Sequence, residues 1–149
     1  MLRFTFEEAA RIAQPSGEWF GHGFERHPFE LHVRSVDEAL AFRSCWVPCP
    51  RFADYAKDPK WKEGEAGSNG ADTPAFADVF DMTRRVHIMA CSKAIMDRIR
   101  PGRCPSDCPP DDIIAFDGNH RLAALGLRRS RGLRDEVKID VYVCTPVAG

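Results

Sequence analysis

The residues best suited to chemistry lie in the stretch IIAFDGNHRLAALG, at positions 113–126. An apolar run stops at Asp117 and Gly118, and a run with helical spacing begins after Arg121. A strand that leads through such a turn into a helix places the N–H groups of the helix start at the end of the sheet. These groups and the positive end of the helix dipole attract anions, and a guanidinium matches two phosphate oxygens at once. The pattern predicts a phosphate-binding turn.

A purely structural turn explains the same residues. Asp-Gly is a common turn pair, Asn119 is a favourable N-cap, and Arg121 can pair with Asp117. The spacing leaves both interpretations open.

Asp117 can also have either of two roles. Next to a bound phosphate, a carboxylate serves as a Mg²⁺ ligand or as a catalytic base, whereas at a strand end it often only fixes the turn.

The sequence IIAFDGNHRLAAL resembles the signature of the ParB/sulfiredoxin superfamily, in which a strand leads into a D-G-x-H-R turn and an Ala-rich helix. The resemblance extends over roughly residues 85–145. It implies an α/β fold in which helices flank a small mixed sheet. It also implies that His120 and Arg121 contact nucleotide phosphates and that His120 takes part in catalysis. Gly118 and Asn119 would supply backbone donors.

Activities in this superfamily include CTP hydrolysis, ATP-dependent sulfinic acid reduction and phosphorylation of free serine. The resemblance therefore implies a nucleoside triphosphate, ATP or CTP, that binds with Mg²⁺ and undergoes phosphoryl transfer or hydrolysis at the turn. Sulfiredoxins carry a reactive cysteine just before the His-Arg pair, and Asn119 stands there in this chain, so we expect no sulfinic acid reduction. We also expect no role in chromosome partition, because the DNA-binding and dimerisation regions of ParB proteins find no room after residue 145.

A phosphoryl-transfer reaction to a hydroxyl needs a group that accepts the proton of that hydroxyl. Four candidates lie close together before and within an expected short strand: Glu25, His27, Glu30 and His32. We take Glu30 as the catalytic candidate. The alternative is that all four are solvated surface groups.

Two further groups of residues can be interpreted either as ligand-binding residues or as structural ones. Four cysteines in two Cys-x3-Cys pairs can hold a structural Zn²⁺ or simply lie in proline-rich loops: Cys45, Cys49, Cys104 and Cys108. Cys91 and Cys144 lie in apolar segments and are expected in the core. Three tryptophans can stack on a nucleotide base or anchor the core and its loops: Trp19, Trp46 and Trp61.

The segment LGLRRSRGLR, at positions 125–134, forms a local basic patch. Cations suit the C-terminal end of a helix, and the net charge of -1 argues against a broad positive field for nucleic acids. A DNA-binding or nuclease function is therefore a rival to phosphoryl transfer, with less support. A third alternative is a module of phage or conflict-system type that sequesters a ligand without catalysis.

A chain of 149 residues, of which 44% are hydrophobic and 29% charged, fits one globular domain. We expect residues 85–145 to form the core that carries the site, and residues 1–84 to be an elaboration of it. The sequence has no recognisable signal peptide or membrane-spanning apolar segment, so we expect a cytoplasmic protein without membrane contact. The pattern gives no indication of the oligomeric state.

The elements that position the turn have local signals. Capping boxes at Thr5 and Ser35 predict two helices, the second ending at about Arg43, and Ser92 caps a third. A buried strand at 113–116 and a helix at about 120–128 flank the turn. Residues 86–90 fit either a strand or a helix. The other expected elements are a strand at 29–33, a closing strand at 138–144, a surface loop at 57–72 and a helix after Thr73.

Overall fold

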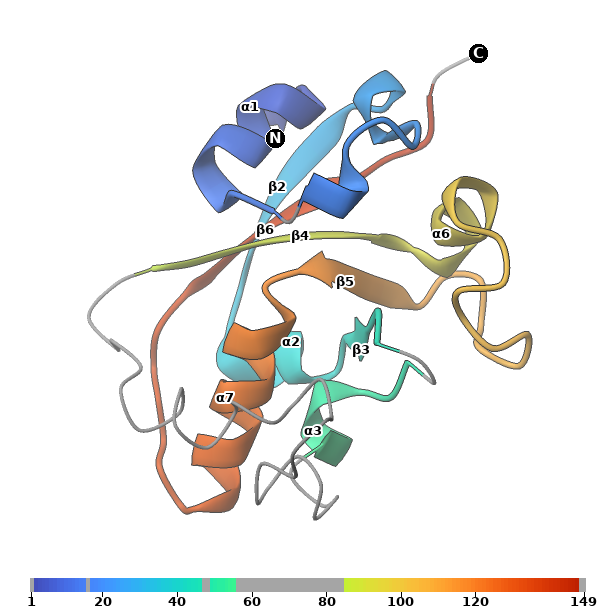
Figure 1. Cartoon of the computed structure of the whole chain (residues 1–149). Coiled ribbons are helices and arrows are strands. Elements are labelled where there is room, and N and C mark those ends of the chain that lie inside the picture. The colour runs from blue at the N-terminus through green and yellow to red at the C-terminus, as the bar shows by residue number, and fades with distance from the viewer. Residues whose placement is uncertain (1, 16, 47–48, 56–84, 148–149) are drawn as a thin grey trace.

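The computed structural model describes residues 2–15, 17–46, 49–55 and 85–147. Within these residues, six strands form a mixed sheet with helices on both faces (Figure 1). Across the sheet their order is β1 (Arg3–Phe4), β2 (Phe29–Arg34), β6 (Ile139–Cys144), β4 (Val86–Ser92), β5 (Ile113–Asp117) and β3 (Arg43–Ser44). The predicted α/β class with a small mixed sheet is confirmed.

Strands from both halves of the chain build this sheet. β2 runs antiparallel to β6, β6 parallel to β4, β4 antiparallel to β5, and β5 parallel to β3. The centre comes from residues 86–144, whereas β1, β2 and β3 from the N-terminal half form the two sides. The parallel pairing of Ser44 with Ala115 carries the residues after β3 toward the end of β5.

One face of the sheet packs against the N-terminal helix α1 (Phe6–Ala13) and two 3-10 helices, Gly17–Trp19 and Phe24–Arg26. An aromatic cluster fills this layer, and the rings of Phe24 and Phe116 stack at 4.3 Å between centroids. Ile95 and Met96 of α6 (Lys93–Ile99) join the same cluster. The layer buries β5 on the face that Phe116 occupies.

The opposite face packs against α7 (Asn119–Ser130), α2 (Val36–Leu40) and α3 (Phe52–Tyr55). Figure 1 shows α1 and α7 on opposite sides of the sheet. Leu122 and Leu125 of α7 are fully buried against β4 and β6 residues such as Ile88 and Val141. Within the described parts of the chain, no helix is both long enough and apolar enough to cross a membrane.

Most locally signalled elements are confirmed. The capping boxes at Thr5 and Ser35 are formed, and Ser92 caps α6. The predicted end of the second helix near Arg43 is wrong, since α2 ends at Leu40. Arg43 instead pairs with β5, and its Nε donates to Asp112 Oδ2 at 2.7 Å. Residues 86–90 belong to strand β4, and the loop and helix expected at 57–84 lie outside the described residues.

Candidate functional site

The predicted turn lies where β5 ends and α7 begins. Asp117 is the last residue of β5, and Gly118 is the N-cap of α7, with a φ of 85° in the left-handed region. A Cβ added at Gly118 would lie 2.3 Å from Ile88 Cγ2. Only glycine meets both conditions, because it adopts this φ without strain and has no side chain to collide with β4. The turn therefore presses directly against the neighbouring strand.

The start of α7 exposes hydrogen-bond donors to this end of the sheet. The first intrahelical bond runs from Leu122 N–H to the Gly118 carbonyl at 3.0 Å. The N–H groups of the residues between them have no partner inside the helix. No side chain caps this helix start, since the Gly118 N-cap has none. Together with the dipole of a 12-residue helix, these groups contribute positive partial charge at the turn.

Asn119 turns its side chain inward and anchors the turn. It is 6% exposed. Its Oδ1 accepts from the Cys45 backbone N–H at 3.2 Å, and its Nδ2 donates to the Ala115 carbonyl at 3.1 Å. The suggestion that Asn119 is the N-cap is thus wrong, because Gly118 occupies that position. Both side-chain ends of Asn119 are engaged in these bonds, so we assign its backbone N–H to a ligand at the turn.

Asp117 has an unusual environment for a carboxylate. It is 9% exposed, and its Oδ2 is buried without a hydrogen-bond partner. Burial raises the pKa of Asp117 to about 6, although the Arg121 guanidinium favours the charged form. Arg121 Nη2 lies 4.0 Å from Oδ2, which is too far for a hydrogen bond. A buried carboxylate oxygen in this state attracts a proton or a cation.

Arg121 bonds to β4 and also lies within ion-pair distance of Asp117. Its Nη1 donates to the His87 carbonyl at 2.6 Å, and 31% of its side chain is exposed. The guanidinium thus keeps donors that this bond does not use. Nearby, His87 Nδ1 lies 3.4 Å from Asp140 Oδ2, and Arg85 makes two bonds to that same carboxylate at 2.9 and 2.6 Å. His87 of β4, Asp140 of β6 and Arg85, which precedes β4, therefore form a separate cluster of polar and charged side chains.

A cavity of about 260 Å³ opens beside the turn. Three segments line it, namely the first 3-10 helix, the residues after β3, and the turn: Glu18, Trp19, Cys45, Trp46, Phe116, Asp117, Gly118, Asn119 and His120. The rings of Trp46 and His120 meet edge to face at 4.8 Å. Arg121 does not line this cavity. The cavity thus combines aromatic walls with the helix start and two carboxylates.

The structure does not bring Glu30 to the turn. Glu30 lies on β2, and β6 and β4 separate that strand from β5. Arg3 Nε and His32 Nε2 each lie 4.0 Å from its carboxylate oxygens. Glu25 accepts bonds from the N–H groups of a nearby loop, and His27 Nδ1 lies 3.0 Å from the Thr145 carbonyl. These candidate proton acceptors take part in local structure away from the cavity.

Sequence reasoning missed Glu18 and Cys45 as residues of the site. Glu18 has no motif of its own, Cys45 was considered only as a zinc ligand or a loop residue, and both are far from the turn in sequence. The parallel pairing of β3 with β5 brings Cys45 to the cavity, and this pairing has no local signal. Trp19 and Trp46, which were candidates for stacking or for anchoring, both line the cavity, and Trp19 is also buried in the core.

The four cysteines of the two Cys-x3-Cys pairs are buried, with free thiols. Cys49 and Cys104 are in contact, with 3.3 Å between their sulfurs. Among the described residues, no three His, Cys, Asp or Glu side chains are grouped so that they could hold a metal ion. The geometry of these residues gives the alternative of a structural Zn²⁺ no support.

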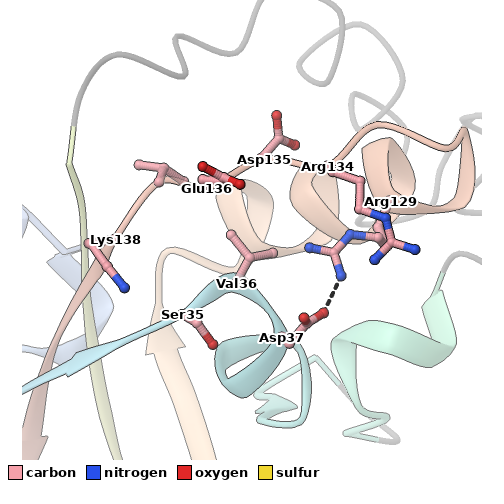
Figure 2. A pocket seen from close by; sticks show the side chains of 9 residues that line it. Ser35, Val36, Asp37, Arg129, Arg134, Asp135, Glu136 and Lys138 are labelled. Atoms are coloured by element: carbon pink, nitrogen blue, oxygen red, sulfur yellow. Dashed lines mark hydrogen bonds and ion pairs between the residues drawn. The ribbon is translucent and has the colours of Figure 1, made fainter.

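A second cavity, of about 380 Å³, lies away from the turn, where α2 begins and α7 ends (Figure 2). Arg129 of the basic patch bonds to Asp37 here. Arg128 makes two bonds to Asp135, at 3.0 and 3.1 Å. Two arginines of the patch are thus paired with acids, and this pairing reduces the positive charge that is available to bind a nucleic acid.

The chemical groups at the turn and its cavity suit an anion that binds together with a metal cation. The helix start supplies donors, the two carboxylates at the cavity supply negative charge, and the indoles supply flat apolar walls. Comparisons of the chain with protein-family models, with curated proteins and with solved structures found no match.

Proposed function

We propose that the protein binds a nucleotide or another phosphorylated small molecule at residues 117–121, together with Mg²⁺, and transfers or hydrolyses a phosphoryl group. The observation that carries the proposal is the cavity of about 260 Å³ that adjoins both the start of α7 and Asp117. The resemblance of the turn to that of ParB/sulfiredoxin proteins adds support and makes ATP and CTP the first ligands to test.

The phosphate is assigned to the helix start. Backbone N–H groups and the helix dipole favour a negative group there. His120 lines the same cavity and adds a donor, which also makes it the candidate for proton transfer to or from the reacting oxygen. Arg121 follows His120 in the helix and lies outside the cavity. Its positive charge adds to the attraction of the helix start for a phosphate. Direct contact is therefore assigned first to the backbone and His120.

Mg²⁺ fits the carboxylates that are present. Asp117 Oδ2 is buried without a hydrogen-bond partner, and Glu18 lines the same cavity. Mg²⁺ typically takes one or two carboxylates, ligand phosphates and several waters. When bound, the ion would neutralise charge on the phosphate. We therefore assign Asp117 to the metal, and without a cation this carboxylate would repel a phosphate.

The dimensions of the cavity suggest how a larger ligand would lie. Pockets that enclose whole small molecules usually measure about 300–1,000 Å³, and this cavity holds about 260 Å³. We infer that it takes the phosphoryl end of the ligand. The rest would extend outward past Trp46, whose ring lies at the cavity wall beside His120.

Isothermal titration of the full chain with ATP, CTP, GTP and ADP-ribose, with and without Mg²⁺, tests this function. We expect at least one ligand to bind more tightly with Mg²⁺. Asp117→Asn should weaken the Mg²⁺-dependent binding by at least about tenfold. Glu30→Gln is the matched control, because that carboxylate lies on β2 and should leave affinity unchanged. A folded protein that binds none of the four ligands would contradict the proposal.

Two other functions have less support. DNA binding would use the basic patch, but Arg128 and Arg129 are paired with Asp135 and Asp37. A module that binds without catalysis would use the same turn and cavity. Product analysis after incubation with the bound nucleotide separates that module from an enzyme, since the module releases the ligand unchanged.

A further inference from the structure

We infer that Cys49 and Cys104 form a peroxide-sensitive thiol pair, which hydrogen peroxide or an organic hydroperoxide oxidises to an intramolecular disulfide. The pair lies outside the residues that line the candidate site. The inference does not depend on the proposed function.

The two sulfurs are already in contact. Cys49 Sγ donates to Cys104 Sγ at 3.3 Å, although the residues are 55 positions apart in the chain. Cys49 follows β3, and Cys104 follows α6. A disulfide requires the sulfurs to approach to about 2.05 Å, which is a movement of roughly one ångström between two loops.

The surroundings give the two thiols different roles. The bond from the Cys49 S–H lowers the pKa of Cys104, against the opposing effects of burial and of Asp97. Lys93 and Arg103 favour the charged form to a smaller extent. The same bond and burial raise the pKa of Cys49. Cys104 is 7% exposed and Cys49 is fully buried. Cys104 is therefore the more acidic and the less buried of the two thiols. We assign it the attack on a small peroxide, with Cys49 in contact with it as the second thiol.

Three of the other described cysteines lack this combination. Burial raises the pKa of Cys45 to about 11 and that of Cys144 to about 12. Burial also raises the pKa of Cys91 well above its ordinary value. These thiols stay protonated at neutral pH and react slowly, because the thiolate is the nucleophile.

The oxidation proceeds in two steps. The Cys104 thiolate attacks one peroxide oxygen, the O–O bond breaks, and Cys104 becomes a sulfenic acid as hydroxide or alkoxide leaves. The Cys49 sulfur then attacks the Cys104 sulfur, the S–S bond forms, and the S–O bond breaks. The departing hydroxide takes the Cys49 proton and leaves as water. Two electrons have passed from the two sulfurs to the peroxide.

Peptide mapping of the full, reduced chain after exposure to limiting hydrogen peroxide tests this inference. We expect an intact mass lower by about 2 Da and a peptide pair linked through Cys49 and Cys104, which dithiothreitol separates. In Cys49→Ser, the sulfenic acid on Cys104 should persist and be trapped by dimedone. In Cys104→Ser, the linkage should be absent, and the rate of thiol loss should fall by at least about tenfold.

Cys108→Ser is the matched control, because Cys108 is also nearly buried and lies four residues from Cys104. This variant should form the Cys49–Cys104 linkage at the wild-type rate. The wild-type result stands even where a variant fails to fold. The inference is overturned if peroxide leaves Cys49 and Cys104 as free thiols, or if it links either of them to another cysteine.

Discussion

Asn119 binds Cys45 at two points. Its Oδ1 accepts from the Cys45 backbone N–H at 3.2 Å, and its Nδ2 donates to the Cys45 thiol at 3.3 Å. These residues are 74 positions apart in the chain. The bonds fasten the start of α7 to the segment that follows β3, and so they hold together two walls of the candidate cavity.

Replacement of this anchor should destabilise the fold. Asn119→Ala leaves the buried Cys45 N–H without its acceptor, so we expect the free energy of unfolding to fall by about 2–3 kcal/mol. Urea denaturation measures this change. At a pH where the new acid is protonated, Asn119→Asp keeps an acceptor for Cys45 N–H and has one O–H donor in place of the two N–H donors of the amide, so its stability should fall between those of wild type and alanine. Equal stability of Asn119→Ala and wild type would contradict the anchoring role.

The close approach of Gly118 to β4 can be separated from its backbone conformation. Gly118 and Gly132 have nearly the same φ, 85° and 83°, but a Cβ at Gly132 meets nothing within 4 Å. Gly132→Ala should therefore cost about 1 kcal/mol, from the left-handed conformation alone. Gly118→Ala should cost about 1–3 kcal/mol more, because the new Cβ overlaps Ile88. Thermal or urea unfolding of the two variants gives the difference, and equal losses would contradict the tight contact.

Asp117 should make the folded state less stable as the pH rises. Its pKa is raised from 3.8 to about 6 on folding, so the unfolded chain loses this proton first. Below about pH 4 the contribution of Asp117 to the free energy of unfolding is fully present. Between pH 4 and 6 this contribution is lost, which lowers the free energy of unfolding by about 3 kcal/mol. Asp117→Asn cannot lose the proton, so we expect it to exceed wild type in stability at pH 7.

Urea unfolding of wild type and Asp117→Asn at several pH values between 4 and 7 measures this effect. The difference between the two proteins should grow with pH and level off above about pH 6. A constant difference across this range would show that the carboxylate is not perturbed by burial. A protein that becomes more stable when a buried acid is replaced is also what we expect where that acid serves ligand binding rather than folding.

Arg121 should modulate the protonation of Asp117. Its guanidinium lies 4.0 Å from Asp117 Oδ2 and lowers the pKa of that carboxyl against the effect of burial. Arg121→Ala should therefore raise the pKa of Asp117 above about 6. Arg121→Lys retains the charge and should shift this pKa less. Carboxyl carbon shifts from NMR report the titration, and an unchanged midpoint in Arg121→Ala would contradict the coupling.

Local signals were enough to predict much of the fold. Capping residues such as Thr5 and Ser35 locate helix starts by bonds to residues three positions away, so they can be read from the sequence. The strand-turn-helix around Gly118 is equally local. The fold class was an implication of the resemblance of the turn to that of ParB/sulfiredoxin proteins, and the predicted helices and strands are consistent with it, because helices that alternate with strands can cover a sheet.

The candidate site depends on pairings that are not local. Cys45 and Trp46 reach the cavity because β3 pairs in parallel with β5, whereas helix periodicity had extended the preceding helix through Arg43. Glu30 lies away from the turn because the strand order places β6 and β4 in between. The contact of Cys49 with Cys104 likewise joins two loops. Strand order and loop contacts of this kind follow from the packing of the whole chain.

The central claim is that the backbone N–H groups at the start of α7 bind a phosphate. The most direct measurement is a titration of the ¹⁵N-labelled chain with ATP or CTP and Mg²⁺, followed by amide chemical shifts. The account predicts that the largest saturable changes occur at Asn119, His120 and Arg121, and that they shrink in Asp117→Asn. Saturable changes confined to another surface, such as the cavity between α2 and α7, or no changes in a folded protein, would contradict it.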